Sequence, residues 1–213
     1  MAKSIKELGI VVGYRCNFTC AHCCVRDCVP LSLTRREKNK IVSSINRRSP
    51  RTIRFVGGEP ALYLRTINGI LASARDLSSS KILITTNGYF ATTRMAAIKV
   101  LRSFHKLDSV QLSYDKFHAE FLPFENVKNL YSACKELEIK FCVVNTIASP
   151  MDLVGLKVLE AVGEFKILIN KVMSAGAAAR NGIEYVYPSF DKGVLRQRCA
   201  LRKVMGYVCG RGF

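Results

Sequence analysis

Short runs of apolar, often β-branched residues alternate along the chain with longer stretches of helical period. The apolar runs predict strands at residues 8–14, 52–57, 81–86, 109–114, 140–147 and 166–173. The stretches between them predict helices at about 34–47, 62–76, 92–104, 125–137 and 151–163. The helix at 125–137 is the clearest, because apolar residues from Val127 to Leu137 recur at steps of three and four. Strands that alternate with helices in this way are typical of a parallel sheet.

Six successive strand–helix units predict an α/β fold, a partial (β/α)6 TIM barrel of parallel strands. We expect the barrel to occupy residues 1–180, and residues 181–213 to form a short C-terminal extension with a short strand at 184–187. In such barrels the functional residues come from the carboxyl ends of the strands. Glycine and polar residues gather at these positions: Gly57, Gly58, Glu59, Asn87, Ser113, Asp115 and Asn145.

The first strand is followed by a loop that carries Cys16, Cys20 and Cys23 with the spacing C-x3-C-x2-C. Soft thiolates select zinc, Cu(I) or iron–sulfur clusters over hard cations. Three thiolates on one loop can hold three irons of a 4Fe-4S cluster and leave the fourth iron open for another ligand. A structural zinc site, which fills all four positions with protein ligands, is the noncatalytic alternative.

This cysteine loop, followed by Gly57–Pro60 after the next strand, resembles the radical S-adenosylmethionine (SAM) superfamily, and most closely its peptide-maturing branch. The resemblance implies an enzyme whose cofactors are a 4Fe-4S cluster, held by Cys16, Cys20 and Cys23, and SAM. It implies reductive cleavage of SAM to a 5'-deoxyadenosyl radical that abstracts hydrogen from a substrate. It further implies that the Gly57–Gly58–Glu59 turn binds SAM and that His22 occupies the position of an aromatic residue near the adenine.

The same resemblance makes Ser113 and Asp115 candidates for contact with the SAM ribose or with the substrate, and Asn87 and Asn145 further candidates. Residues 113 and 115 of an alternating strand point to the same side. A helix or turn cap is the structural alternative for the Ser/Asp pair. His118 is a candidate acid or base or an ordinary loop residue, and no residue is assigned a catalytic role.

Six other cysteines need separate interpretation. Cys134 and Cys142 lie within an apolar helix face and an apolar strand, and we expect both to be packed core residues. The remaining four can contribute to an auxiliary cluster, which many peptide-modifying members carry downstream of the barrel, or remain free thiols: Cys24, Cys28, Cys199 and Cys209.

The net charge of the chain indicates which kinds of partner it could bind. The chain has 33 Lys and Arg against 16 Asp and Glu, a net charge of +17 in 213 residues. A nucleic-acid partner is therefore possible, but it is not favoured because no nucleic-acid module is recognisable among the dispersed basic residues. A basic surface that steers an acidic peptide or an anionic cofactor is the alternative.

The sequence shows neither an export signal nor an apolar stretch of about 18 residues that would span a membrane. With an odd total of nine cysteines, it favours a cytoplasmic protein with reduced thiols. We expect the substrate to be a peptide and the reductant to be a donor such as flavodoxin or ferredoxin, as the resemblance implies. A nucleoside, RNA or small-metabolite substrate is the alternative within the same chemistry, and a noncatalytic zinc or iron–sulfur regulator is the alternative of another class.

Overall fold

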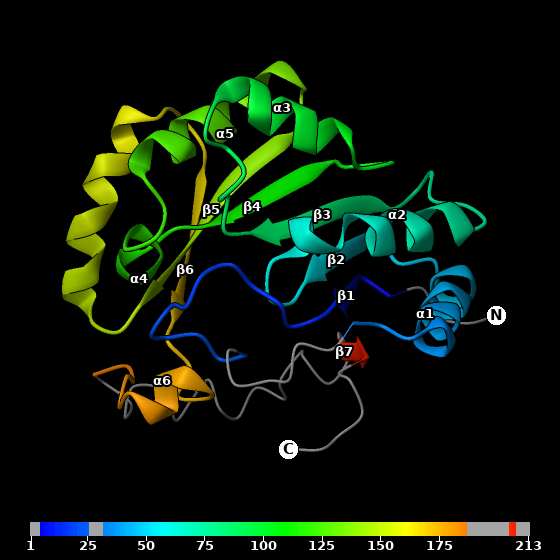
Figure 1. Ribbon diagram of the computed structural model, residues 1–213, viewed down its shortest axis with the longest axis horizontal. Coiled ribbons are helices and arrows are strands. Elements are labelled where there is room, and N and C mark those ends of the chain that lie inside the picture. Colours follow the sequence, from blue (N-terminus) through cyan, green and yellow to red (C-terminus); the bar gives the residue numbers. More distant parts are fainter. Residues whose placement is uncertain (1–4, 26–31, 187–204, 208–213) are drawn as a thin grey trace.

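The computed structural model describes residues 5–25, 32–186 and 205–207, and its centre is a parallel sheet (Figure 1). The strands are β1 (Glu7–Val11), β2 (Thr52–Val56), β3 (Lys81–Thr86), β4 (Ser109–Ser113), β5 (Lys140–Ile147), β6 (Lys166–Lys171) and β7 (Met205–Tyr207). Their order is β6-β5-β4-β3-β2-β1-β7, so neighbouring strands from β1 to β6 follow the order of the chain. All six predicted strands are present, and β6 and β7 are not paired with each other. The sheet is therefore the predicted partial barrel, open at one side.

Helices return the chain between the strands. They are α1 (Arg35–Arg48), α2 (Leu64–Ser73), α3 (Arg94–Arg102), α4 (Lys116–Ala119), α5 (Phe124–Glu136) and α6 (Ala177–Arg180), with 3-10 helices η1 (Pro60–Tyr63) and η2 (Pro150–Ala161). Four of the five predicted helices form as α-helices. Helix α1 begins in a capping box, in which the Thr34 side chain accepts from the Glu37 backbone N–H and Glu37 accepts from Thr34.

The core lies between the sheet and its outer helices, with α2, α3 and α5 on one side of the sheet in Figure 1. Along β2 and β3, alternate residues are buried completely: Ile53, Phe55, Ile82 and Ile84. These face the helices, because successive strand residues point to opposite sides. The residues between them, Arg54 and Leu83, are half-buried and point to the other side of the sheet. Arg54 contacts Glu7 on β1 and Gln111 on β4, so the inner face of the barrel carries charged and polar contacts beside apolar residues.

Several local expectations were wrong. Residues 150–161 form a 3-10 helix, and Leu159 is its one buried residue, so little packing is available to stabilise an α-helix there. Cys134 is fully buried as expected, whereas Cys142 is half-buried on the polar inner face. Residues 184–186 do not form a strand, and Tyr187 lies outside the described residues.

Within the described ranges, no helix combines the length and the apolar character that crossing a membrane would require.

Candidate functional site

The carboxyl ends of the six predicted strands open onto one cavity of about 670 Å³. Each strand end contributes to its lining, which includes Tyr14, Gly57, Gly58, Thr86, Asn87, Ser113, Thr146 and Asn170. A cavity of this size fits a small-molecule cofactor, since such sites usually measure roughly 300–1,000 Å³. The expectation that the polar strand ends meet at one mouth is confirmed by this lining.

Cys16, Cys20 and Cys23 also line the cavity. Cys20 is buried, Cys23 is half-buried and Cys16 is exposed. The Cys16 Sγ accepts hydrogen bonds from the backbone N–H of Phe18 at 3.4 Å and from the Asn87 side-chain amide at 3.6 Å. The Asn87 amide also donates to the Asn17 Oδ1 at 3.0 Å. Asn87, at the end of β3, therefore fixes the start of the cysteine loop.

The environment of these thiols fits a metal centre. Burial raises the pKa of the Cys20 thiol to about 12, and the nearby Asp115 carboxylate adds to the rise. The pKa of Cys16 is also raised, because its thiol is partly desolvated at the cavity wall although the residue as a whole is exposed. Both thiols are therefore protonated at neutral pH without a cation, and iron or another metal would replace their protons as it binds. Three soft thiols that face one cavity fit a 4Fe-4S cluster with an open iron.

The cysteine loop is joined to the Gly57–Gly58–Glu59 turn through backbone hydrogen bonds. The Gly58 N–H donates to the Gly13 carbonyl at 2.8 Å, and the Glu59 N–H donates to the Arg15 carbonyl at 2.9 Å. Gly57 has a φ of +142°, and a Cβ atom added at Gly58 would lie 2.2 Å from the Arg15 carbonyl oxygen. Both glycines are needed because no larger residue fits between the two backbones.

Glu59 is fully buried, and its carboxyl group accepts hydrogen bonds from other residues of the protein. Its Oε1 accepts from the Ala61 N–H at 2.9 Å and from the Thr86 hydroxyl at 2.7 Å, and its Oε2 accepts from the Asn87 N–H at 2.8 Å. Burial raises the pKa of Glu59, although these hydrogen bonds oppose the rise. The carboxyl group thus ties the β2 turn to the end of β3. Gly57 and Gly58 line the cavity, and Glu59 is not among its described lining residues.

Asp115 lies between two histidines beneath the cysteine loop. Its Oδ2 is 2.9 Å from the His118 Nδ1 and 3.7 Å from the His22 Nε2. Its Oδ1 accepts hydrogen bonds from the backbone N–H groups of Phe117 and His118. Asp115 therefore caps helix α4, which was the structural alternative for this residue. Burial alone would raise the pKa of Asp115, but interaction with His118 and His22 holds it below its usual value.

His22 is half-buried and neutral at physiological pH, because its partial burial lowers its pKa to about 4. Its ring stacks on Phe117 with 4.4 Å between centroids and 19° between planes. Among the described residues, the His22 Nδ1 and the Asn145 Oδ1 are buried polar atoms without a hydrogen-bond partner. Such atoms are usually satisfied in proteins, so the Nδ1 of His22, which lines the cavity, marks a position where a ligand can supply the missing contact.

The other predicted residues fall into two groups. Ser113 and Asn87 line the cavity, as a role in ligand binding would require. Asn145 is buried and donates to the Tyr114 carbonyl at 3.0 Å, and it is not among the described lining residues. Cys24 is exposed and lines the cavity, whereas Cys28, Cys199 and Cys209 lie outside the described residues. An auxiliary cluster therefore stays a prediction.

Sequence reasoning missed the segment that closes the cysteine loop from the side of β6. The Ala177 N–H donates to the Cys23 carbonyl at 2.9 Å, and the Asn181 side-chain amide donates to the Ala21 carbonyl at 2.9 Å. Helix α6 thus holds the end of the loop that the glycine turn does not reach. The sequence signal for this region is the small and polar turn Ser174–Gly176, which follows the sixth strand as such turns follow the others.

A mixed donor set also occurs within the site. One donor atom from each of Cys20, His22 and His118 lies within 4.8 Å of the others. Sulfur and imidazole nitrogen in this combination are typical zinc ligands. This set shares Cys20 with the cluster-type set and would compete with it for metal.

Comparison with known proteins identifies the family. The Radical SAM superfamily matches residues 10–152. YydG of Bacillus subtilis (strain 168), a protein named for peptide biosynthesis, is 27% identical over 186 residues, which are 81% of this chain and 56% of that protein. A Sulfolobus acidocaldarius protein named for GTP 3',8-cyclase activity is 28% identical over 116 residues, 51% of this chain and 37% of that protein. The chain thus spans about half or less of the length of these relatives.

Solved structures share the fold. Methylornithine synthase (PylB) aligns with a TM-score of 0.60 and 12% identity over 86% of this chain and 58% of its own. The enzyme anSMEcpe, with bound AdoMet and a peptide, aligns with a TM-score of 0.57 and 16% identity over 77% of this chain and 50% of its own. At these identities the likeness establishes the partial barrel alone.

Replacement of Gly58 by Ala tests whether the glycine turn positions the cysteine loop. We expect Gly58→Ala to lower the free energy of unfolding by about 1–3 kcal/mol, the usual cost of overpacking. It should also lower the iron bound per chain after anaerobic reconstitution, because the added Cβ displaces the Arg15 carbonyl beside Cys16. Urea unfolding and iron analysis measure the two effects.

Gly69→Ala is the matched control, since nothing lies within 4 Å of a Cβ at that helical position. It should leave iron content unchanged and unfolding unchanged or more difficult. If Gly58→Ala behaves like this control, the turn does not position the loop.

Proposed function

Because the chain belongs to the radical SAM superfamily of SAM-dependent radical enzymes, which use a 4Fe-4S cluster, we propose that Cys16, Cys20 and Cys23 hold this cluster and that the adjoining cavity binds SAM. The observation that carries the proposal is that the three thiols and the Gly57–Gly58 turn line the same cavity. When bound, the cluster supplies an electron to SAM, which provides the 5'-deoxyadenosyl radical that abstracts hydrogen from the substrate.

The protein's residues would position these groups and exclude competing reactions. The glycine turn allows close approach to the backbone at one wall of the cavity, and Asn87 and Ser113 offer polar atoms at the next two strand ends. Phe117 covers one face of the His22 ring. The opposite face and the unpartnered Nδ1 can serve the adenine, which combines a flat surface with hydrogen-bonding atoms. Asp115 would hold His22 and His118 in position through the contacts of its Oδ2 with both imidazole rings.

A peptide is the substrate class that the comparisons favour. A relative that matches 81% of the chain is named for peptide biosynthesis, and one structural neighbour was solved with a peptide. The cavity mouth is bordered by exposed Met173, an apolar contact that suits a peptide side chain. The relative named for GTP 3',8-cyclase activity covers half of the chain and makes a nucleotide the rival substrate class. A donor such as flavodoxin or ferredoxin would supply electrons, and reduced thiols suit a cytoplasmic setting.

The zinc alternative has one observation in its favour, the convergence of Cys20, His22 and His118. It leaves Cys16 and the large cavity without a function, and a regulator of this kind does not need a SAM site. Metal analysis of anaerobically purified protein separates the two proposals, with iron and sulfide expected for the enzyme and a single zinc for the regulator.

The cluster assignment predicts the effect of single cysteine replacements. Cys16→Ala, Cys20→Ala and Cys23→Ala should each abolish the release of 5'-deoxyadenosine and methionine from SAM in the presence of dithionite, because each removes an iron ligand. Cys134→Ala should retain the activity, since Cys134 is buried in α5 away from the cavity. Product chromatography measures both. Equal loss in all four variants, or no product from iron-replete unaltered protein, would contradict the proposal.

The substrate class can be tested by deuterium transfer. Cells of the organism that encodes this chain, grown in deuterated medium, yield peptide, small-metabolite and RNA fractions with deuterium on carbon. The reconstituted protein, given dithionite, unlabelled SAM and one fraction at a time, should release deuterated 5'-deoxyadenosine with the peptide fraction. Mass spectrometry detects the label. Transfer from only the RNA or metabolite fraction would overturn the peptide proposal and leave the radical chemistry intact.

A further inference from the structure

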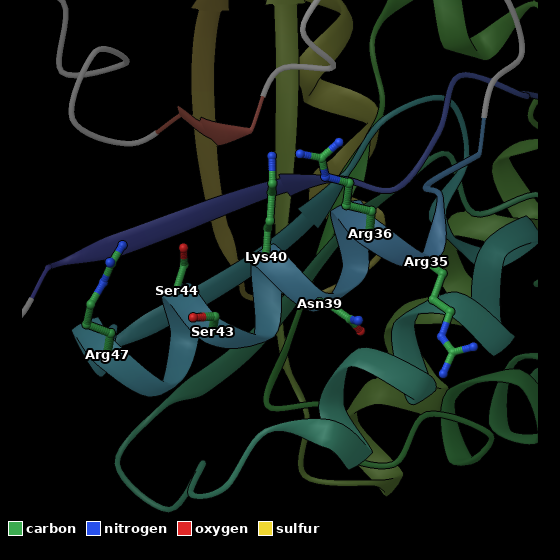
Figure 2. A pocket seen from close by; sticks show the side chains of 7 residues that line it. All are labelled: Arg35, Arg36, Asn39, Lys40, Ser43, Ser44 and Arg47. Carbon is green, nitrogen blue, oxygen red and sulfur yellow. The ribbon is translucent and has the colours of Figure 1, made fainter.

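The exposed side of α1 carries a basic hollow of about 780 Å³ (Figure 2). Its lining comes entirely from this helix: Arg35, Arg36, Asn39, Lys40, Ser43, Ser44 and Arg47. Figure 2 shows Arg36, Lys40 and Arg47 extending from the same side of the helix. A neighbouring hollow shares Asn39, Ser43 and Arg47 and extends to Arg75, which follows α2. We refer to Arg35, Arg36, Lys40, Arg47 and Arg75 as the α1 patch.

The α1 patch is not neutralised by acidic side chains of the described residues. None of its five cations takes part in an ion pair there. The acidic residue of α1, Glu37, is engaged in the capping box with Thr34 at 2.7–2.8 Å. The positive potential of the patch is therefore available to a partner.

The position of α1 connects the patch with the cysteine loop. Ser32, shortly before the helix, pairs with Gly13, three residues before Cys16. Arg35 and Arg36 therefore lie at the end of the helix nearest the cluster site. The lining of the α1 hollow shares no described residue with the SAM cavity, so the patch approaches the cysteine loop from outside the barrel.

We propose that the α1 patch docks the acidic one-electron donor protein that reduces the cluster, an inference that rests on the proposed function. Arginine guanidinium groups bind carboxylates in a bidentate manner, and Asn39 and Ser43 add hydrogen-bonding groups between them. In the docked complex one electron leaves the reduced flavin of a flavodoxin-type donor, and the cluster gains it. The donor then dissociates without entering the SAM cavity.

Two other partners fit the patch less well. Single-stranded nucleic acid is usually bound by a basic groove with aromatic platforms for the bases, and neither hollow on α1 has an aromatic lining residue. A substrate must reach the mouth of the barrel, whereas the patch lies outside it. An electron donor needs only to come close to the cluster, which the position of Arg35 and Arg36 allows.

Charge reversal on α1 tests the proposal. The variant Arg36→Glu/Lys40→Glu/Arg47→Glu is compared with Lys99→Glu/Arg102→Glu/Lys135→Glu, which makes the same change in net charge at exposed positions of α3 and α5. Binding of a recombinant bacterial flavodoxin to each reconstituted protein is measured by fluorescence anisotropy at low and moderate salt. Formation of 5'-deoxyadenosine is measured separately with reduced flavodoxin and with dithionite.

We expect the α1 variant to bind flavodoxin about 10- to 100-fold more weakly at low salt, which lies within the roughly 10- to 1,000-fold range that electrostatic steering contributes to association rates. Its reaction with reduced flavodoxin should slow correspondingly, while its reaction with dithionite stays unchanged. The α3/α5 control should change each quantity less than threefold. Equal weakening in both variants, or unchanged flavodoxin binding by the α1 variant, would overturn the proposal.

Three further results complete the test. If the glutamate variant folds poorly, Arg36→Gln/Lys40→Gln/Arg47→Gln replaces it in the same comparison. If the α1 variant loses affinity for a labelled random RNA but not for flavodoxin, the patch is a nucleic-acid site and the proposal is wrong. If unaltered protein forms no product with dithionite, the proposed function fails, while the flavodoxin-binding comparison still decides whether the patch docks the donor.

Discussion

The structure depends on the close pairing of two backbone segments, the start of the cysteine loop and the glycine turn after β2. Hydrogen bonds from the Gly58 N–H to the Gly13 carbonyl and from the Glu59 N–H to the Arg15 carbonyl fix the start of the cysteine loop, and therefore Cys16, at the mouth of the barrel. This pairing is possible only because Gly57 and Gly58 have no side chains. Glu59 extends it to β3, and α6 holds the other end of the loop through Ala177 and Asn181. Metal ligands placed on a loop become a defined site when the loop is anchored at both ends.

Burial and charge divide the molecule into regions with different tasks. The site combines the buried thiol of Cys20, a neutral histidine and a carboxylate that holds two imidazoles, an arrangement whose charge balance favours a bound cation. The inner face of the barrel holds polar groups in contact with one another, with Arg54 half-buried and Gln111 buried. The outside of α1 concentrates cations that have no acidic partner in the described part of the chain. In the proposed function, this arrangement would separate radical chemistry inside the barrel from electron delivery at its outer surface.

Much of this arrangement could be predicted from the sequence, because strand positions depend on local apolar runs. The six strands and the meeting of their polar ends followed from that pattern. The direction of individual side chains did not, since it depends on contacts between distant segments. Asp115 turns to cap α4 and to contact His22, and Glu59 turns inward to Thr86 and Asn87. Cys142 faces the inner side of β5 because the next residue, Val143, faces the buried side and successive strand residues point in opposite directions. The contacts of α6 with the loop involve residues about 160 positions apart, which no local pattern reveals.

The central claim is that the three cysteines hold a 4Fe-4S cluster whose open iron binds SAM. Mössbauer spectroscopy of anaerobically reconstituted protein, recorded with and without SAM, tests it most directly. The account predicts a 4Fe-4S spectrum in which the signal of one iron changes when SAM is added and the signals of the other three do not. A spectrum that SAM leaves unaltered, or a protein that binds zinc and no cluster under these conditions, would contradict it.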